Sequence, residues 1–176
     1  MSETIILVDE NDNQIGTAEK LKAHQDNALH RAFSIYIFNS KGQVLLQKRA
    51  KGKYHSGGLW SNTCCSHPRV EEKLTEAIHR RLEEEMGFDT ALHKSHETIY
   101  QCNFDNGISE HEFLHVFMGT YDGDVIMNPE EGEDYKWADP KEILEDIKTH
   151  PQLYSFWFKK CFEEVLKTAQ DSQLYD

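Results

Sequence analysis

Acidic residues recur at helical spacing in one charged segment of this chain, residues 69–87, whose sequence is RVEEKLTEAIHRRLEEEMG. Side chains three and four residues apart lie on the same face of a helix, so the segment can present several carboxylates together. Mg²⁺ prefers oxygen ligands of this kind and commonly bridges a carboxylate to the phosphates of a substrate. The spacing indicates a face that binds divalent cations and phosphate, with a solvated helix face as the plainer alternative.

This segment resembles the Nudix signature, G-x5-E-x7-R-E-U-x-E-E-x-G-U, and its matching positions are Glu72, Arg80, Leu82, Glu84, Glu85 and Gly87. Two positions differ: Ser66 stands in place of the opening glycine, and Arg81 replaces the glutamate that follows the arginine. A hydrolase with this signature needs several acids to hold the metal cluster that activates water, so Arg81 argues against hydrolysis. Because a guanidinium is suited to phosphate oxygens, we expect the altered helix to bind a diphosphate without cleaving it.

A cysteine and a histidine with side chains suited to chemistry lie just before that segment, in NTCCSHP at residues 62–68. Successive side chains of an extended chain point to opposite faces, so Cys65 and His67 are expected on the same side. Four cysteines in the whole chain lack the density and spacing of a disulfide framework. This favours reduced thiols with a catalytic or metal role for some of them.

The same alternation places Glu110 and Glu112 together. His24 and His30 lie upstream, and with His67 they complete a set of three histidines and two glutamates. This mixed nitrogen and oxygen donor set suits Mn²⁺, Zn²⁺ or Mg²⁺ in a single site. Surface loop positions are the alternative for His24 and His30.

The composition limits the classes of partner. A chain of 176 residues is long enough to bury a core and is expected to form one domain. Its net charge of −12 argues against nucleic acid, whose phosphate backbone is bound through clustered Lys and Arg. The early apolar run from Ile5 to Val8 is too short for a signal peptide or a membrane span. We therefore expect a cytoplasmic protein with no membrane and no nucleic-acid partner.

The elements that must position these residues form one continuous α/β unit. Strands are expected at residues 5–8, 32–38, 43–48, 98–104 and 112–120, and helices at 19–24 and 155–166. Hairpin turns are expected at residues 39–42 and 105–107. In the charged segment, Gly87 sits where a C-terminal helix cap belongs. The apolar positions that recur there at helical spacing are Leu74, Ala77, Ile78, Leu82 and Met86.

Taken together, the motifs resemble the type 1 isopentenyl-diphosphate isomerases, a Nudix-fold family, nearly from end to end. Besides the altered Nudix helix, the motifs that carry the resemblance are Glu19-Lys20-x-x-x-His24, Leu29-His30-x-Ala32-Phe33-Ser34, Trp60-Ser61-Asn62-Thr63-Cys64-Cys65-Ser66-His67-Pro68, Glu110-x-Glu112 and Trp157. The resemblance implies an α/β (α+β) fold with a Nudix-type mixed β-sheet sandwiched between helices. It implies a single domain over residues 1–176, with its core at residues 30–165. It also implies an isomerase that interconverts isopentenyl and dimethylallyl diphosphates in isoprenoid biosynthesis.

The resemblance also implies a role for each candidate residue. Cys65 and Glu112 match the family's proton-transfer groups on opposite sides of the substrate, and Tyr100 assists Glu112. The ligands of a Mn²⁺ or Mg²⁺ site, with Zn²⁺ as a further option, match His24, His30, His67, Glu110 and Glu112. Glu85 and the backbone carbonyl of Cys65 match the site of a second ion, Mg²⁺, on the substrate diphosphate. The diphosphate-binding cations match Lys20, Arg49, Lys53 and Arg81.

Moving an unactivated double bond needs one proton added and another removed, with a tertiary carbocation or something close to it in between. A tyrosine hydroxyl beside a metal-bound glutamate can deliver a proton, and a cysteine thiolate can accept one. We favour Glu112 with Tyr100 as the donor toward dimethylallyl diphosphate. An indole face stabilises a desolvated cation by roughly 2 kcal/mol or more, which gives Trp157 a role beyond its alternative as a plain core residue.

Two other functions stay open on the sequence alone. One is a Nudix hydrolase acting on a nucleoside diphosphate derivative, against which Arg81 and the Cys65–His67 pair weigh. The other is a small zinc-binding interaction module built from Cys64, Cys65, His67 and Cys102, although adjacent cysteines fit tetrahedral zinc poorly. Nothing predicts a repeating barrel of strands and helices, so a flavin-dependent isomerase is excluded and no flavin is expected. The expected partner is a small-molecule isoprenoid diphosphate, bound by a monomer, with a homodimer as the alternative.

Overall fold

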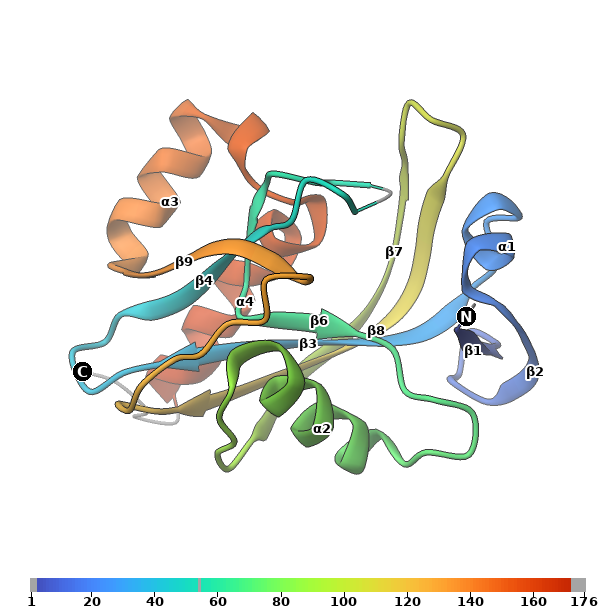
Figure 1. The fold of residues 1–176 in the computed structure, drawn as a ribbon, viewed down its shortest axis with the longest axis horizontal. Coiled ribbons are helices and arrows are strands. Elements are labelled where there is room, and N and C mark those ends of the chain that lie inside the picture. The colour runs from blue at the N-terminus through green and yellow to red at the C-terminus, as the bar shows by residue number, and fades with distance from the viewer. Residues whose placement is uncertain (1–2, 54, 172–176) are drawn as a thin grey trace.

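One long buried strand lies at the centre of the molecule, and the other elements are arranged around it (Figure 1). The computed structural model describes residues 3–53 and 55–171, so the domain predicted over residues 1–176 extends beyond them at both ends. The strands are β1 (Thr4–Val8), β2 (Gln14–Glu19), β3 (His30–Phe38), β4 (Val44–Arg49), β5 (Trp60–Ser61), β6 (Cys64–Ser66), β7 (His93–Asn103), β8 (Ser109–Thr120) and β9 (Gly132–Ala138). The helices are α1 (Lys20–Gln25), α2 (Leu74–Met86), α3 (Pro140–Thr149) and α4 (Phe156–Asp171), with a 3₁₀ turn at Pro151–Leu153.

The central strand is β3, whose sequence HRAFSIYIF is buried almost throughout. A strand covered on both faces shows a nearly continuous apolar run in place of an alternation. Along its whole length β3 pairs in parallel with β8, which sets His30 opposite Glu112. On its other edge β3 pairs antiparallel with β6, which sets Ser34 opposite Cys65. The strands β6 and β8 therefore flank β3 from opposite sides.

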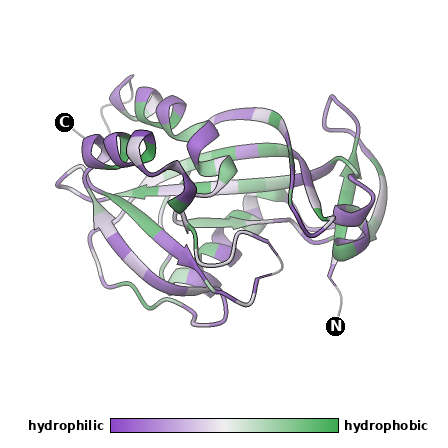
Figure 2. Cartoon of the chain, turned by 90° about the horizontal axis from the view of Figure 1, so that it is seen from above, coloured by the Kyte–Doolittle hydropathy of each residue, from purple (hydrophilic) through white to green (hydrophobic). Residues whose placement is uncertain are grey.

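Helices cover both faces of the sheet (Figure 1). On one face, α2 packs against strand residues that include Phe33 and Leu45. On the other face, α3 and α4 pack against alternate residues that include Tyr36 and Leu46. Figure 2 shows hydrophobic residues gathered on the central strands, whereas the helices carry both hydrophilic and hydrophobic residues. This arrangement confirms the predicted mixed sheet sandwiched between helices.

The helix α2 begins at Leu74, inside the charged segment. Residues 69–73 of that segment precede it and are not helical. Gly87 adopts a left-handed φ of 76° directly after the helix, which confirms the predicted cap. Arg80 donates hydrogen bonds of 2.7 and 2.9 Å to Glu72, so two signature residues tie the preceding loop onto the helix. The apolar positions that are buried as predicted are Ala77, Ile78, Leu82 and Met86.

The first predicted hairpin forms only in part. Its turn at residues 39–42 is present, but among the described residues β3 and β4 pair only at Phe38 and Val44. Because β5 pairs with β4 and β6 pairs with β3, residues 60–66 cross between the two halves of the sheet. The second hairpin, β7 with β8, is confirmed and is longer than predicted.

The elements that were not predicted include β2, β5, β9 and α3. The sequence of β2, QIGTAE, is mostly exposed and lacks the apolar alternation of a half-buried strand, and in β9, GEDYKWA, only Tyr135 and Trp137 alternate with polar residues. The start of α3 has a capping signal in the sequence, because Asp139 accepts a hydrogen bond from the Lys141 N–H and Pro140 occupies the first turn.

The predicted tail helix is present as α4, which begins at Phe156 and extends to Asp171. The aromatic positions expected to be core, including Trp157 and Phe162, are buried. Neither α4 nor any other helix among residues 3–53 and 55–171 is long and apolar enough to cross a membrane.

Candidate active site

One pocket gathers the predicted site residues from widely separated parts of the chain. Those that line it are Lys20, Arg49, Lys53, Cys65, His67, Arg81, Glu85, Tyr100, Glu110, Glu112 and Trp157. The two remaining residues, His24 and His30, lie against Glu110 and Glu112 with 0% of their surface exposed. The alternative that these histidines are surface loop residues is therefore wrong.

Strand register decides which side chains share the face covered by α4. Ser34 and His30 lie on one face of β3, because residues an even number apart point the same way. Their partners in the neighbouring strands, Cys65 and Glu112, point to that face as well. Neighbouring strands are roughly 4.8 Å apart, so β6 and β8, which carry Cys65 and Glu112, lie about 10 Å apart across the sheet. The two residues are also offset along the strands, because their partners Ser34 and His30 are four residues apart on β3. Trp157, from α4, lies over this face.

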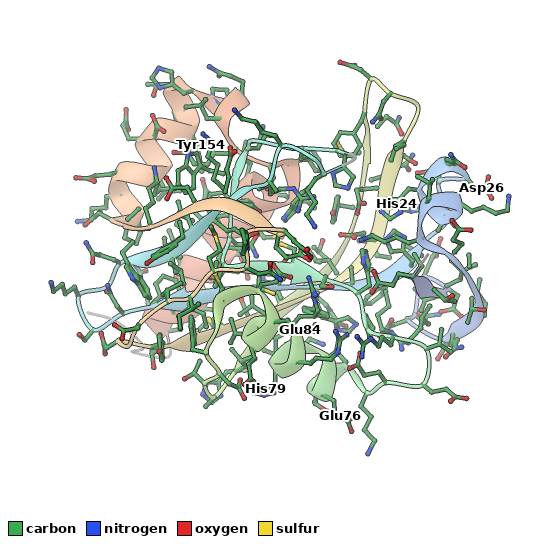
Figure 3. The ribbon with its side chains drawn as sticks, in the orientation of Figure 1. His24, Asp26, Glu76, His79, Glu84 and Tyr154 are labelled. Atoms are coloured by element: carbon green, nitrogen blue, oxygen red, sulfur yellow. The ribbon has the colours of Figure 1, made fainter. Side chains whose placement is uncertain are left out.

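Three histidines and a carboxylate come close enough to share one cation. Ligand atoms of His24, His30, His67 and Glu110 all lie within 4.8 Å of one another, and all four residues are buried. Figure 3 shows His24 on the side of α1 that faces the β7–β8 hairpin, whereas Asp26 lies on the outer side. The cluster joins α1, the start of β3, the segment after β6, and β8.

Glu112 completes the predicted ligand set. Its Oε2 lies 3.3 Å from His30 Nε2 and 3.2 Å from His67 Nε2, while Glu110 contacts His24. Burial lowers the pKa of His67 to about 4, so its ring is neutral at neutral pH. Burial opposes ionisation of Glu110, but hydrogen bonds with Glu112 and His24 outweigh this and hold its pKa well below the usual range.

The arrangement of these donors fits a divalent cation. Within the described residues, His30 Nε2 is a buried ring nitrogen that faces Glu112 Oε2 but forms no hydrogen bond with it. An unpaired buried polar atom costs about 1–3 kcal/mol, so this nitrogen needs a partner. Neutral imidazoles beside an ionised carboxylate are the forms in which such residues bind Mn²⁺, Zn²⁺ or Mg²⁺.

Tyr100 lies directly opposite Glu112 in the β7–β8 pair, as the hairpin register requires. Its Oη donates a hydrogen bond to Glu112 Oε1. Burial, together with the negative charge of Glu112, raises the pKa of Tyr100 well above its ordinary value. Tyr100 is therefore a neutral phenol that can hold a proton at the pocket wall.

Cys65 is a protonated thiol in this pocket. Its Sγ lies 3.1 Å from Asn62 Oδ1, accepts a hydrogen bond of 2.9 Å from Trp157 Nε1 and lies 3.5 Å from Ser34 Oγ. Burial raises the pKa of Cys65 to about 11, although Ser34, Arg49 and Asn62 act in the opposite direction. The thiolate that the sequence suggested as a proton acceptor is thus not the resting form at neutral pH.

Trp157 belongs both to the core and to the pocket. Its side chain is packed in the core cluster beneath α4, and only 4% of the residue is exposed. The Arg49 guanidinium carbon lies 5.0 Å from the centre of the Trp157 ring. The indole therefore donates its N–H to the Cys65 sulfur and presents its π face to the Arg49 guanidinium.

Two of the predicted diphosphate-binding cations share an acidic partner that the sequence did not indicate. Glu131 accepts a hydrogen bond of 2.6 Å from Lys53 Nζ and lies 3.0 Å from Arg81 Nη2. Burial opposes its ionisation, but Lys53 and Arg81 outweigh this and lower the pKa of Glu131 to about 2. The residue lies in the loop between β8 and β9, where no motif or periodicity marks it.

The two arginines retain unused donors. Among the described residues, Arg49 Nε and Arg81 Nε are buried without a hydrogen-bond partner. The fourth predicted cation, Lys20, lies 3.7 Å from Glu3. Guanidinium N–H groups of this kind are suited to phosphate oxygens.

Glu85 is held near the C-terminal end of α2 and is only 2% exposed. Gln47 donates a 3.2 Å hydrogen bond to one of its oxygens, and Arg81 donates one of 2.7 Å to the other. Burial raises the pKa of Glu85 above its ordinary value. The role of Gln47 was not predicted, while the second ion at Glu85 and the Cys65 carbonyl stays a prediction.

The cysteines do not form the zinc module considered above. Cys64 is buried among the residues beneath α2, whereas Cys65 packs toward the opposite face of the sheet. Cys102 lies on β7 and is partly exposed. Among residues 3–53 and 55–171, the group of side chains arranged to hold a cation contains no cysteine.

Two curated relatives of this chain carry the same enzyme name. The NUDIX domain family matches residues 28–158. An isopentenyl-diphosphate Delta-isomerase 2 from Aromatoleum aromaticum is 52% identical over 166 residues, which cover 94% of this chain and 88% of the relative. An isopentenyl-diphosphate Delta-isomerase from Burkholderia multivorans is 48% identical over 165 residues, which cover 94% of this chain and 94% of the relative. The chain belongs to the isopentenyl-diphosphate Delta-isomerases of the NUDIX family.

This member of the isopentenyl-diphosphate Delta-isomerases shares its fold with more distant proteins. DR0079 from Deinococcus radiodurans superposes with a TM-score of 0.70 at 19% identity, over 84% of this chain and 90% of the other. A MutT protein from Methanosarcina mazei gives a TM-score of 0.66 at 20% identity, over 82% of this chain and 95% of the other. At these identities the likeness concerns the fold alone.

Proposed function

We propose that this protein interconverts isopentenyl diphosphate and dimethylallyl diphosphate in isoprenoid biosynthesis, with Cys65 and the Tyr100–Glu112 pair as its proton-transfer groups. The observation that supports this most directly is their placement on strands that lie on opposite sides of β3, facing the same pocket. Moving a double bond requires proton transfer at two carbons of the substrate, so two such groups must flank it. The strands β6 and β8 lie roughly 10 Å apart across β3, and the further offset of the two groups along the strands leaves room for a small chain between them.

In the direction of dimethylallyl diphosphate, the Tyr100–Glu112 pair delivers a proton to the double bond, and Cys65 removes one from the neighbouring carbon. Cys65 must first release its own proton to solvent water. The Trp157 N–H and the positive charge of Arg49 stabilise the resulting thiolate. The indole face of Trp157 stabilises positive charge that develops between the two transfers, by roughly 2 kcal/mol in a desolvated site.

The two oxygens of Glu112 have separate partners. Oε1 accepts the hydrogen bond from Tyr100, and Oε2 faces His30 and His67. A divalent cation, when bound, would fix the carboxylate and draw negative charge from it. The residues that would hold this cation are His24, His30, His67, Glu110 and Glu112.

The residues that hold the diphosphate are Lys20, Arg49, Lys53 and Arg81, and Glu85 would hold a Mg²⁺ ion that offsets its negative charge. Arg81 forms ion pairs with Glu84 at 3.1 Å and with Glu85 at 2.7 Å, so the acids of α2 face a fixed positive charge. This arrangement favours binding of a diphosphate over its hydrolysis, because activation of water needs several free acids around the metal.

The first test is incubation of the purified protein with isopentenyl diphosphate and Mg²⁺ in deuterated water, followed by NMR. We expect dimethylallyl diphosphate that carries deuterium, because protons are exchanged during the transfer. Release of phosphate from the substrate, or from nucleoside triphosphates and nucleotide sugars run in parallel, would instead support a hydrolase. Unchanged substrate in the presence of Mg²⁺ and Mn²⁺ would contradict the proposal.

Every proposed site residue comes from one chain, so we expect the monomer to be active. Light scattering coupled to size-exclusion chromatography, with activity measured across the same peak, tests this expectation. Activity confined to a dimer peak would contradict it.

A further inference from the structure

His55 lies in the loop between β4 and β5, and its side chain turns inward to line the pocket with only 6% exposed. The same loop contains Lys53, one of the proposed diphosphate cations. Neither spacing nor motif distinguished His55 in the sequence. Its surroundings in the structure distinguish His55, because it contacts both the proposed metal ligands and the aromatic wall of the pocket.

The polar contacts of His55 fix the position of its ring proton. Its Nε2 lies 3.0 Å from Glu110 Oε1, and its Nδ1 lies 3.2 Å from Ser56 Oγ. Because a carboxylate only accepts, Nε2 carries a proton and donates it to Glu110. The oxygen that His55 contacts is the one that lies against His24.

The ring of His55 is also packed between aromatic side chains. It stacks on Phe104, with 4.6 Å between ring centres and an angle of 5° between the ring planes. It meets Trp157 edge to face, with 5.7 Å between ring centres. Phe104 directly follows β7 and Trp157 lies in the first turn of α4, so His55 joins the loop to two other elements.

The backbone on the C-terminal side of His55 is tightly constrained. Ser56 has a φ of 55° and Gly58 has a φ of 78°, and a side chain at Gly57 would meet the Lys51 carbonyl at 2.8 Å. A serine adopts this left-handed conformation only where its surroundings hold it there. The loop is therefore shaped to direct His55 into the pocket.

We propose that His55 is a positioning residue, which aims the Glu110 carboxylate at the metal site and fastens the Lys53 loop against Phe104. This inference rests on the proposed site formed by the histidines and glutamates. Carboxylates that bind metals are commonly oriented by a hydrogen bond from a second residue, whose loss weakens metal binding by about 10- to 100-fold. His55 thereby links the metal end of the pocket to the diphosphate end.

The hydrogen bond is tested with His55→Phe, which keeps an aromatic ring on Phe104 but cannot donate to Glu110. Binding of Mn²⁺ to the full chain is followed by electron paramagnetic resonance without diphosphate. We expect affinity about 10- to 100-fold weaker, with one ion still bound at saturation. His55→Gln, whose amide can donate from the same place as Nε2, should restore much of the affinity. The matched control is His79→Gln, since His79 lies on the outer side of α2 (Figure 3).

The packing is tested with His55→Ala, assayed at saturating Mn²⁺ beside His55→Phe. An aromatic pair contributes enough to change an equilibrium by about two- to tenfold, so KM for isopentenyl diphosphate should rise by that factor in His55→Ala. The KM of His55→Phe should stay close to wild type. We expect kcat to change little in either variant once the metal is saturating.

Unchanged Mn²⁺ affinity in His55→Phe would overturn the positioning role while leaving the metal site intact. Failure of His55→Phe to bind one ion at any Mn²⁺ concentration would also overturn it, because His55 would then be a ligand. If the wild-type protein binds no Mn²⁺, or binds it undiminished after His24→Ala, the metal site itself fails and the role of His55 fails with it.

Discussion

Cys64 and Cys65 are neighbours in the chain, but their side chains lie on opposite faces of the sheet. Cys64 is fully buried beneath α2, and Cys65 faces the pocket, where Trp157 donates to its sulfur. The environment of each residue therefore decides which cysteine can take part in chemistry. Alternation alone pairs Cys65 with His67, whereas the contact with Trp157 depends on the packing of α4.

Replacing Cys65 by alanine removes one of the two proposed proton-transfer groups. General acid–base groups contribute about 10²–10⁴-fold to a rate, so we expect kcat for isopentenyl diphosphate to fall by that factor or more. Diphosphate affinity, measured by calorimetry with inorganic pyrophosphate and Mg²⁺, should change little. Cys161→Ala, a change at a second buried thiol, is the control. Retained turnover in Cys65→Ala would remove Cys65 from the mechanism.

Cys102 distinguishes the proposed metal site from a zinc module. It is partly exposed and does not belong to the group of histidines and Glu110 that can hold a cation. We expect Cys102→Ala to retain the metal content of the wild-type protein, measured by plasma mass spectrometry, whereas His67→Ala should lose it. A loss of metal from Cys102→Ala would support the zinc module.

At the scale of elements, the C-terminal end of α2 receives the loop that carries Glu131. Ile126 and Asn128 donate backbone hydrogen bonds of 2.9 and 2.8 Å to the carbonyls of Met86 and Glu85. A side chain at Gly87 would meet Ile126 at 2.8 Å. Glycine is thus needed both for the left-handed turn and for this close approach.

Gly87→Ala should reduce the free energy of unfolding by more than the left-handed conformation alone would cost. That conformation costs about 1–2 kcal/mol for a residue with a side chain, and the contact with Ile126 adds to it. Gly107→Ala is the matched control, since Gly107 has a φ of 79° and nothing within 4 Å of an added side chain. Urea unfolding measures both. Equal losses would show that the Ile126 contact contributes nothing.

At the scale of the whole molecule, the histidine and glutamate cluster connects parts of the chain that are far apart in sequence. His24 comes from α1, His30 from the start of β3, His67 from the segment after β6, and Glu110 from β8. A cation bound at these residues would link the N-terminal elements to the central sheet. Its binding energy would then add to the stability of the whole fold.

We therefore expect Mn²⁺ to stabilise the protein and a chelator to destabilise it. A ligand at one hundred times its Kd adds about 2.7 kcal/mol to the free energy of unfolding when it binds only the folded state. Thermal unfolding with Mn²⁺, and after dialysis against EDTA, measures the change. His24→Ala should remove the response to the metal. A wild-type Tm that does not depend on Mn²⁺ would contradict the prediction.

The sequence by itself determined the features that depend on local geometry. Period-two alternation pairs Cys65 with His67 and Glu110 with Glu112, and helical spacing together with Gly87 defines the buried face and the end of α2. The hairpin turn at residues 105–107 was also predicted, whereas the register that sets Tyr100 opposite Glu112 was not. The predicted features are set by neighbours a few residues apart, so a local pattern is enough to predict them.

Only the tertiary structure decided how these local pairs meet. The parallel pairing of β3 with β8 brings His30 to Glu112, and the early separation of β3 from β4 contradicts a simple hairpin. Glu131 and His55 reach the pocket from loops whose sequences carry no periodic signal. The raised pKa of Cys65 likewise arises from burial by distant residues. Long-range register and burial depend on the packing of the whole chain, which no short pattern contains.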